Sequence, residues 1–242
     1  LRVNGLRPVP ISLDDYFLDR EYTPRDEKGD YDFESIEAID LALFNQHLQR
    51  ILDGEEVQIP TFNFKLGRRE YLGHKIQISP EQPLIIEGIH GLNERLTAAI
   101  PRGQKVKIYI SALTQLAVDN HNRIPTTDTR LIRRIVRDSQ FRSHNALTTL
   151  KIWPSVRRGE EKNIFPFQEE ADIMFNSALI YELSILKKYA EPLLEQIAPE
   201  HYEYSEARRL LHFLSYFQPI SEEEVPPNSI LREFIGKSCF HK

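Results

Sequence analysis

Two segments of the sequence place acidic side chains directly after a run of apolar residues. Asp14 and Asp15 follow the apolar segment 8–13, and Glu87 ends the segment 84–87. In an open parallel sheet, the carboxyl ends of the strands form the edge where ligands bind. A carboxylate at that edge can accept a proton from a substrate hydroxyl or hold Mg2+ through water. Alternatively, Asp14 or Asp15 only caps a following helix. Two acidic strand ends in one predicted sheet are therefore more specific evidence for a ligand-binding edge than either one alone.

A group of arginines recurs at helical spacing between Asp128 and Asp138. Four of them stand at i, i+3, i+4 and i+7 and are predicted to share one face: Arg130, Arg133, Arg134 and Arg137. Arg142 extends the group beyond the helix. Guanidinium groups bind phosphate oxygens bidentately and neutralise charge that develops in phosphoryl transfer. Two alternatives remain open, a solvated face balanced by Asp128 and Asp138 and the binding of an RNA backbone.

The elements that would position these side chains alternate along the chain. Four short apolar runs are predicted as buried strands: residues 8–13, 84–87, 106–110 and 172–175. Amphipathic stretches predict helices: residues 35–54, 129–142, 177–197, 205–217 and 229–235. Ser35 can cap the first helix, Gly54 can end it, and Pro192 interrupts the third. Strands that alternate with helices predict an α/β fold with a parallel sheet.

Residues 56–78 are predicted as a hairpin that carries two phenylalanines. Segments 57–59 and 62–64 alternate apolar and polar residues, and Gly67 and Gly73 supply turns in the rest of the hairpin. Phe62 and Phe64 can be core residues of this hairpin or an aromatic surface for a flat ligand.

Composition narrows the class of protein. The formal charge of -5 and the pI near 5.9 argue against a protein that coats nucleic acid. The single cysteine, Cys239, excludes an intramolecular disulfide and fits a reducing compartment. No apolar run approaches the roughly 18 residues that span a bilayer, and no signal-peptide pattern is present, so we expect a cytoplasmic protein without membrane contact. The chain opens with Leu1 and its only methionine is Met174, so we expect a natural N-terminus further upstream.

Five motifs then follow one another along residues 8–180: Ser12-x-Asp14 with aromatic residues after it, Tyr31-Asp32, Ile59-Pro-Thr-Phe-Asn-Phe64 ending at Arg69, Ile86-Glu-Gly-Ile89, and Thr129-Arg-Leu-Ile-Arg-Arg-Ile-Val-Arg-Asp138. In this order they resemble the uridine kinase and phosphoribulokinase family. The resemblance implies a P-loop-kinase-like fold of three layers with a parallel sheet, a phosphotransferase activity, and ATP and Mg2+ as cofactors.

The resemblance also implies roles for single residues around the acceptor. Asp14 matches the base that activates the ribose 5'-hydroxyl, and Asp32 matches the acid that binds the ribose 2'- and 3'-hydroxyls. Phe62 and Phe64 match the aromatic pair of the base pocket, and Arg69 is assigned to substrate binding with them. Aromatic walls suit a flat base, and a carboxylate acceptor suits a diol.

Around the phosphates, Glu87 matches the acid near Mg2+, which it holds directly or through water. The arginines of the basic helix match a cationic lid. We assign Arg134 and Arg137 to catalysis, and we assign Arg130, Arg133 and Arg142 to the phosphate lid.

The chain departs from the family pattern at several places. Uridine kinases carry a histidine after the aromatic pair, where this chain has Gly67, and often a tyrosine where it has Phe62. Segments 113–127, 150–159 and 229–236 resemble a bacterial branch of uridine kinase-like proteins with additional N-terminal domains. The P-loop pattern G-x-x-x-x-G-K-[ST] is absent from this sequence. In the family that loop precedes the segment matching residues 1–7, so we expect this chain to lack the first strand and P-loop and to bind ATP poorly.

These observations lead to one main hypothesis and its rivals. Residues 1–200 are predicted as the α/β kinase domain and residues 201–242 as a helical extension packed on it. The main hypothesis is that the intact protein phosphorylates the 5'-hydroxyl of a nucleoside such as uridine or cytidine, with ATP and the nucleoside as its partners. The rivals are a non-catalytic module that binds a nucleoside or RNA, and a kinase for a sugar phosphate with Arg20 and Arg25 as extra cations. We do not expect nucleic-acid binding, and a homo-oligomer is compatible with the sequence.

Overall fold

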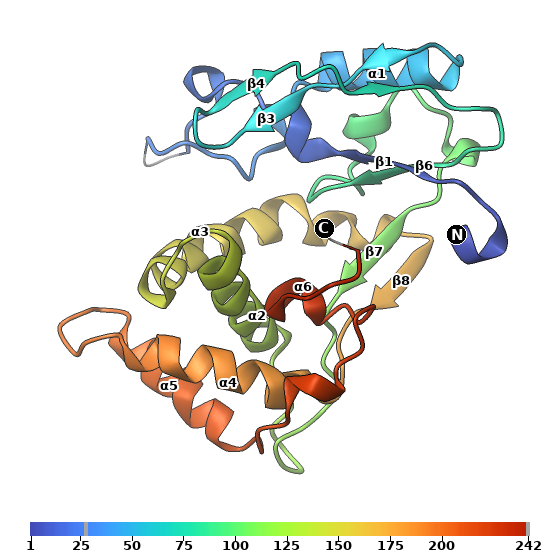
Figure 1. Cartoon of the computed structure of the whole chain (residues 1–242). Helices are drawn as coiled ribbons and strands as arrows, with labels where there is room; N and C mark the ends of the chain where they lie inside the picture. The colour runs from blue at the N-terminus through green and yellow to red at the C-terminus, as the bar shows by residue number, and fades with distance from the viewer. Residues whose placement is uncertain (27–28, 241–242) are drawn as a thin grey trace. The chain divides into compact units, whose positions relative to one another are not determined.

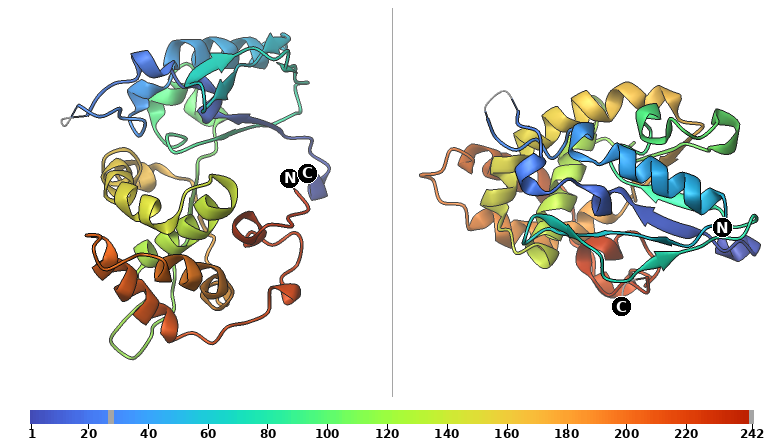
Figure 2. Two further views of the ribbon diagram at one scale, coloured as in Figure 1. Left: turned by 60° about the vertical axis from the view of Figure 1, so that its left-hand side comes forward. Right: turned by 90° about the horizontal axis from the view of Figure 1, so that it is seen from above.

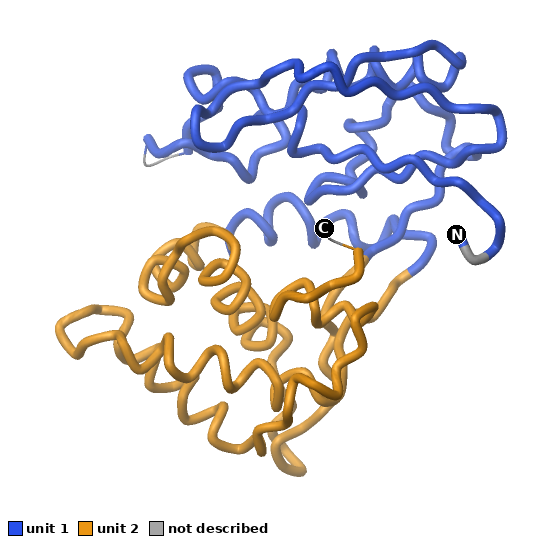
Figure 3. Tube along the Cα trace, in the orientation of Figure 1, with its two compact units in different colours: residues 1–109, 157–173 blue, residues 110–156, 174–242 orange. Residues whose placement is uncertain are grey.

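The computed structural model describes residues 1–26 and 29–240, and it divides the chain into two compact units (Figures 1 and 3). Unit 1 comprises residues 1–109 and 157–173, and unit 2 comprises residues 110–156 and 174–242. Each unit has its own hydrophobic core. Within the described part of the chain, the structure contains no helix with both the length and the apolar character that a bilayer crossing requires. The predicted division at residue 200 stays a prediction.

Unit 1 is built on a parallel pair of strands, β1 (Val9–Ser12) and β6 (Leu84–Glu87). Their register pairs Val9 with Leu84 at one end and Ser12 with Glu87 at the other. Both strands therefore end at the same edge, as the apolar runs predicted. The parallel ladder and the helices around it confirm the predicted α/β class.

Helix α1 (Leu41–Leu52) covers the β1–β6 ladder. Its buried face packs Phe44, Leu48 and Ile51 into the same core cluster as Ile11 of β1, and the right-hand view of Figure 2 shows α1 alongside this strand. The predicted start at Ser35 is wrong. Ser35 caps only a short 3-10 turn, Ile36–Ala38, and the α-helix begins after Asp40, whose carboxylate accepts a hydrogen bond from the Leu43 amide at 3.0 Å.

The predicted hairpin consists of two antiparallel pairs. Strand β2 (Val57–Gln58) pairs with β5 (Lys75–Ile76), and β3 (Thr61–Asn63) pairs with β4 (Arg68–Glu70). The β3–β4 turn closes through Asn63, whose side-chain oxygen accepts hydrogen bonds from the amides of residues 65 and 66 at 3.2 Å. Gly67 follows with a positive φ of 66°, a conformation in which side chains are disfavoured.

Strands β7 (Ile108–Ser111) and β8 (Ile173–Asn176) pair with each other and carry the chain from unit 1 into unit 2. The prediction that these runs are buried is wrong for β8, where Ile173, Met174 and Phe175 are 50%, 55% and 52% exposed, and for one face of β7, where Ile108 and Ile110 are 49% and 61% exposed. It is also wrong for β6, none of whose residues is buried. A two-stranded ladder leaves its strands without the covering layers that a wider parallel sheet has.

Unit 2 is helical: α2 (Thr126–Phe141), the first part of α3 (Ala146–Asn163), α4 (Glu182–Glu195), α5 (Tyr204–Ser215) and α6 (Arg232–Ile235). Helix α2 packs against α4 and α6, and α4 packs against α5. Four of these helices correspond to predicted ones, with α4 and α6 shorter than predicted. Helix α3 was not predicted because Pro154 and Gly159 within it are residues that usually interrupt helices.

Candidate active site

The acidic edge of unit 1 is formed where β1 and β6 end together. Ser12 lies opposite Glu87 across the ladder, and Asp14 follows in the short 3-10 turn Leu13–Tyr16. Asp14 and Glu87 are both exposed. The chain turns closely here, because Gly88 has a φ of 148° and a Cβ on it would lie 2.7 Å from the Leu13 side chain. The structure therefore brings the two predicted acids to adjoining strand ends.

Asp15 connects the acidic edge to the hairpin. Its Oδ1 accepts a hydrogen bond from the backbone amide of Phe62 at 3.2 Å, which ties the aromatic hairpin to the acidic edge. Burial raises the pKa of Asp15, the Phe62 amide opposes that rise, and the nearby charge of Glu87 adds to it. The residue types alone left Asp14 and Asp15 equivalent, and the family resemblance assigned a role only to Asp14. The hydrogen bond of Asp15 to a residue 47 positions away could not be read from the sequence.

An aromatic wall adjoins the acidic edge, and we use that name for five side chains: Phe17, Tyr31, Phe33, Phe62 and Phe64. Phe17 contacts three of them edge-on, with ring centroids 5.6 Å from Phe62 and 6.4 Å from Phe33 and Phe64. Phe62 and Phe64 are 5.1 Å apart. Phe62 is 7% exposed and Phe64 is 60% exposed, so the first anchors the wall in the core and the second presents a ring to solvent.

Asp32 lies between Tyr31 and Phe33 of the wall and is partly buried. Its amide donates to the Pro24 carbonyl at 2.8 Å, and its carbonyl accepts from the Ser35 amide at 3.3 Å. His90, three residues after Glu87, lies within electrostatic range of Asp32: burial lowers the pKa of His90 to about 4, and the charge of Asp32 opposes this shift. Asp32, Glu87 and the aromatic wall thus belong to one region of unit 1.

Arg69 is held by carboxylates of its own unit. Its Nη1 lies 2.9 Å from Oδ2 of Asp40, and its backbone amide donates to Asp19 at 2.9 Å. These contacts fasten strand β4 to the start of α1. The predicted substrate-binding role of Arg69 stays a prediction.

In unit 2, three arginines surround one carboxylate. Asp138 is completely buried, and Nε of Arg134, Nε of Arg137 and Nη1 of Arg142 lie 3.3, 3.6 and 3.6 Å from its oxygens. Burial and then the neighbouring charge of Arg142 lower the pKa of Arg137. Three guanidinium groups around one carboxylate leave an excess of positive charge, which suits an anion such as phosphate.

Arg133 does not belong to that cluster, and the prediction of one continuous basic face needs correction. It is 7% exposed, and it donates from Nε to Glu182 at 3.0 Å and from Nη2 to the Ser177 carbonyl at 2.7 Å. Its guanidinium also lies 5.1 Å from the Phe234 ring. With its donors used inside unit 2, Arg133 acts in packing rather than as a phosphate ligand. Arg130 is half-buried and has an interaction partner within the described chain.

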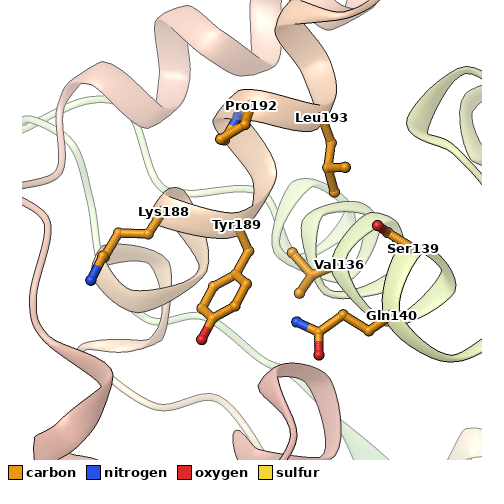
Figure 4. A pocket seen from close by; sticks show the side chains of 7 residues that line it. All are labelled: Val136, Ser139, Gln140, Lys188, Tyr189, Pro192 and Leu193. Atoms are coloured by element: carbon orange, nitrogen blue, oxygen red, sulfur yellow. The ribbon is translucent and has the colours of Figure 1, made fainter.

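A small pocket of about 240 Å³ opens in unit 2 between α2 and α4 (Figure 4). Its lining is Val136, Ser139, Gln140, Lys188, Tyr189, Pro192 and Leu193. Pro192 lacks an amide proton, so it interrupts the hydrogen-bond ladder of α4 beside this pocket. None of the predicted site residues lines it, and we assign it no role.

The acidic edge fits a hard cation that keeps part of its water shell. Among the described residues, no group of three or more His, Cys, Asp or Glu side chains is placed to enclose a metal ion. Mg2+ in phosphate chemistry is typically held by one or two carboxylates together with phosphate oxygens. Glu87, with Asp14 at the adjoining strand end, supplies that type of donor.

A family model described as the phosphoribulokinase / uridine kinase family matches residues 11–183. The chain belongs to this family. The matched range contains every residue of the acidic edge, the aromatic wall and the arginine cluster. Membership in the phosphoribulokinase / uridine kinase family places the chain among the kinases.

Named relatives agree with the family. A uridine kinase of Chloroflexus aurantiacus (strain ATCC 29366 / DSM 635 / J-10-fl) is 25% identical over 175 residues, which cover 72% of this chain and 75% of the relative. A uridine kinase of Bacillus pumilus (strain SAFR-032) is 27% identical over 175 residues, covering 72% and 74%. Among solved structures, one described as a possible uridine kinase from Bacillus stearothermophilus aligns with a TM-score of 0.42 and 13% identity, covering 72% of this chain and 75% of that one.

Proposed function

We propose that the intact protein transfers the γ-phosphoryl group of ATP to the 5'-hydroxyl of a pyrimidine nucleoside such as uridine or cytidine. The observation that carries the proposal is the acidic edge itself. Ser12 and Glu87 pair at adjoining strand ends, Asp14 follows directly, and Asp15 ties the aromatic wall to the same place. Unit 1 then supplies the carboxylate that accepts the proton, the aromatic surface that stacks on the nucleobase and the carboxylate that binds the sugar.

The chemistry follows from the residue types. The Asp14 carboxylate accepts the proton of the 5'-hydroxyl while that oxygen attacks the γ-phosphorus and ADP leaves. Asp32 accepts hydrogen bonds from the ribose diol, and the exposed ring of Phe64 stacks on the base. Glu87 would hold Mg2+, and the bound ion would neutralise charge on the phosphates.

The arginine cluster of unit 2 supports the same reaction. Arg134, Arg137 and Arg142 together present more positive charge than Asp138 neutralises, and such a cluster stabilises the charge that develops on a transferring phosphoryl group.

The test is a panel of acceptors offered to the intact protein with ATP and Mg2+: uridine, cytidine, a purine nucleoside and a pentose phosphate. We expect turnover with the pyrimidine nucleosides and a loss on the order of 10²- to 10⁴-fold in kcat for Asp14→Asn. Glu55→Gln, which removes a charge from an exposed ion pair with Arg50, is the control. Turnover confined to the pentose phosphate would favour the sugar-phosphate rival, and nucleoside binding without turnover would favour the non-catalytic module.

A further inference from the structure

The space beside Gly67 is filled by the side chain of Arg20. A Cβ built on Gly67 would lie 2.8 Å from Nε and 2.9 Å from Cζ of Arg20, so no side chain fits at position 67 while the guanidinium is there. Two hydrogen bonds fix this arrangement. The Arg20 amide donates to the Gly67 carbonyl at 2.8 Å, and Arg20 Nη2 donates to the Phe64 carbonyl at 3.2 Å.

This contact places a cation at the outer end of the aromatic wall. Strand β3 is tied to the acidic edge at Phe62 through Asp15 and runs outward to the turn beyond Phe64. Two residues of extended chain span roughly 7 Å, about the length of a pyrimidine ring with its substituents. A base that lies on Phe64 with its ribose toward Asp14 therefore points its far edge toward Arg20.

The guanidinium of Arg20 is suited to read that edge. It carries five N–H donors and no acceptor, and in the described part of the chain only Nη2 donates from the side chain to a protein oxygen. Arg20 is also exposed, so its remaining donors are available to a ligand. The position of a pyrimidine opposite its glycosidic bond carries a keto oxygen in uracil and an amino group in cytosine.

We propose that Arg20, seated against Gly67, is a specificity-determining residue that favours acceptor bases with a keto oxygen at this edge over bases with an amino group. The inference rests on the proposed function, since it concerns the acceptor of that same reaction. A donor-only group gains a charge-assisted hydrogen bond from the keto oxygen and meets a second donor in the amino base.

The experiment compares kcat/KM for uridine and cytidine in the intact protein and in two variants. One variant removes the Arg20 guanidinium, and the other displaces it. Arg20→Ser removes the guanidinium. Gly67→Ala keeps Arg20 but puts a methyl group where its guanidinium lies. We expect both variants to lower the uridine-to-cytidine ratio by about tenfold, mainly through the KM for uridine.

Two control variants match these changes. Arg68→Ser removes an exposed arginine of the same hairpin, whose Nη2 lies 3.5 Å from Glu70. Gly73→Ala adds a methyl group at another glycine with positive φ, 84°, where nothing lies within 4 Å of the new Cβ. Both controls should keep the ratio within about twofold of the unchanged protein, since neither removes the Arg20 guanidinium nor adds an atom in the space that it fills.

The outcomes separate the inference from the proposed function. An unchanged ratio in Arg20→Ser, in a protein that phosphorylates nucleosides, would overturn the role of Arg20 and leave the kinase intact. If nucleosides are not turned over, calorimetric titration with uridine and cytidine decides the inference, because the preference must then appear in Kd. Binding of neither nucleoside would overturn both.

Discussion

Ser12 of β1 and Glu87 of β6 lie directly opposite each other in a parallel ladder. Because the side chains of paired residues point to the same face of a sheet, this register fixes where Glu87 lies relative to the turn that carries Asp14. A shift of one residue in either strand would turn Glu87 to the other face. The apolar contacts of Ile11 and Leu13 in the core hold the strand in register.

Glu87→Gln should therefore impair metal use without disturbing the fold. The side chain is exposed, so its amide form costs little stability, but it loses the charge that attracts Mg2+. We expect kcat to fall by about 10- to 100-fold and half-saturation to need more Mg2+. A Mg2+ titration of the turnover rate measures both, with Glu56→Gln at the exposed ion pair with Lys75 as control. An unchanged Mg2+ dependence would remove Glu87 from the metal site.

Truncation of Phe62 should mainly lower the stability of the fold, whereas truncation of Phe64 should mainly weaken nucleoside binding. Phe62 is 7% exposed, so Phe62→Ala should lower the free energy of unfolding by about 3 kcal/mol through the cavity it leaves. Phe64 is 60% exposed, so Phe64→Ala should cost less than about 1 kcal/mol but raise the KM for the nucleoside. Urea unfolding and acceptor kinetics on both variants check this pair. A Phe64→Ala protein with unchanged KM would show that the base does not stack there.

The buried histidine gives stability a pH dependence of defined sign. Burial lowers the pKa of His90 from 6.5 to about 4. Between these values the unfolded chain takes up a proton that the folded chain refuses, so the free energy of unfolding falls as the pH falls through this window. The slope from this group is about 1.4 kcal/mol per pH unit, and the contribution levels off below the folded pKa. Burial also lowers the pKa of His47, which adds a slope of the same sign.

Urea unfolding at pH 7.5 and 5.5 measures this dependence. His90→Gln should reduce the difference in stability between the two pH values, because the variant has no proton to take up at this position. His201→Gln, which removes an exposed imidazole, is the matched control. An equal pH dependence in the protein and in His90→Gln would show that His90 is not buried as the structure has it.

Local signals were sufficient for the strands and for most helices. Segment 84–87 was predicted with the bounds that the structure gives it. Its apolar run indicates a strand, and the acid and glycine that follow indicate where the strand ends. Helix α3 was missed because Pro154 outweighed the apolar residues around it. Propensity is a weak signal, and packing in a core can override it.

The placement of Asp14 and Glu87 at adjoining strand ends follows from residues that are neighbours in sequence, whereas contacts between distant residues could not be predicted. Arginine spacing on α2 could not show that Arg133 pairs with Glu182, which lies 49 residues away. Nor could the sequence show that Arg20 fills the space beside Gly67. Both contacts depend on tertiary packing, which a periodic pattern does not encode.

Asp138 should be the residue on which the arginine cluster depends. It is completely buried, and its carboxylate faces Arg134, Arg137 and Arg142 at 3.3 to 3.6 Å. Asp138→Asn keeps the shape but leaves three positive charges without their common counter-charge. Removal of one partner from a buried ion pair typically costs 3–5 kcal/mol, and we expect about 3 kcal/mol here because the arginines are partly exposed.

Urea unfolding of Asp138→Asn with and without sodium tripolyphosphate separates the two roles of this carboxylate. If Asp138 balances an anion-binding cluster, the variant is less stable in buffer and regains part of the loss when the polyanion supplies the missing negative charge. Glu206→Gln, which removes a partly exposed partner of Arg209, should lose less than about 1 kcal/mol and gain no more from the polyanion than the unchanged protein. A variant as stable as the unchanged protein, with the same response to tripolyphosphate, would mean that the three arginines do not depend on Asp138.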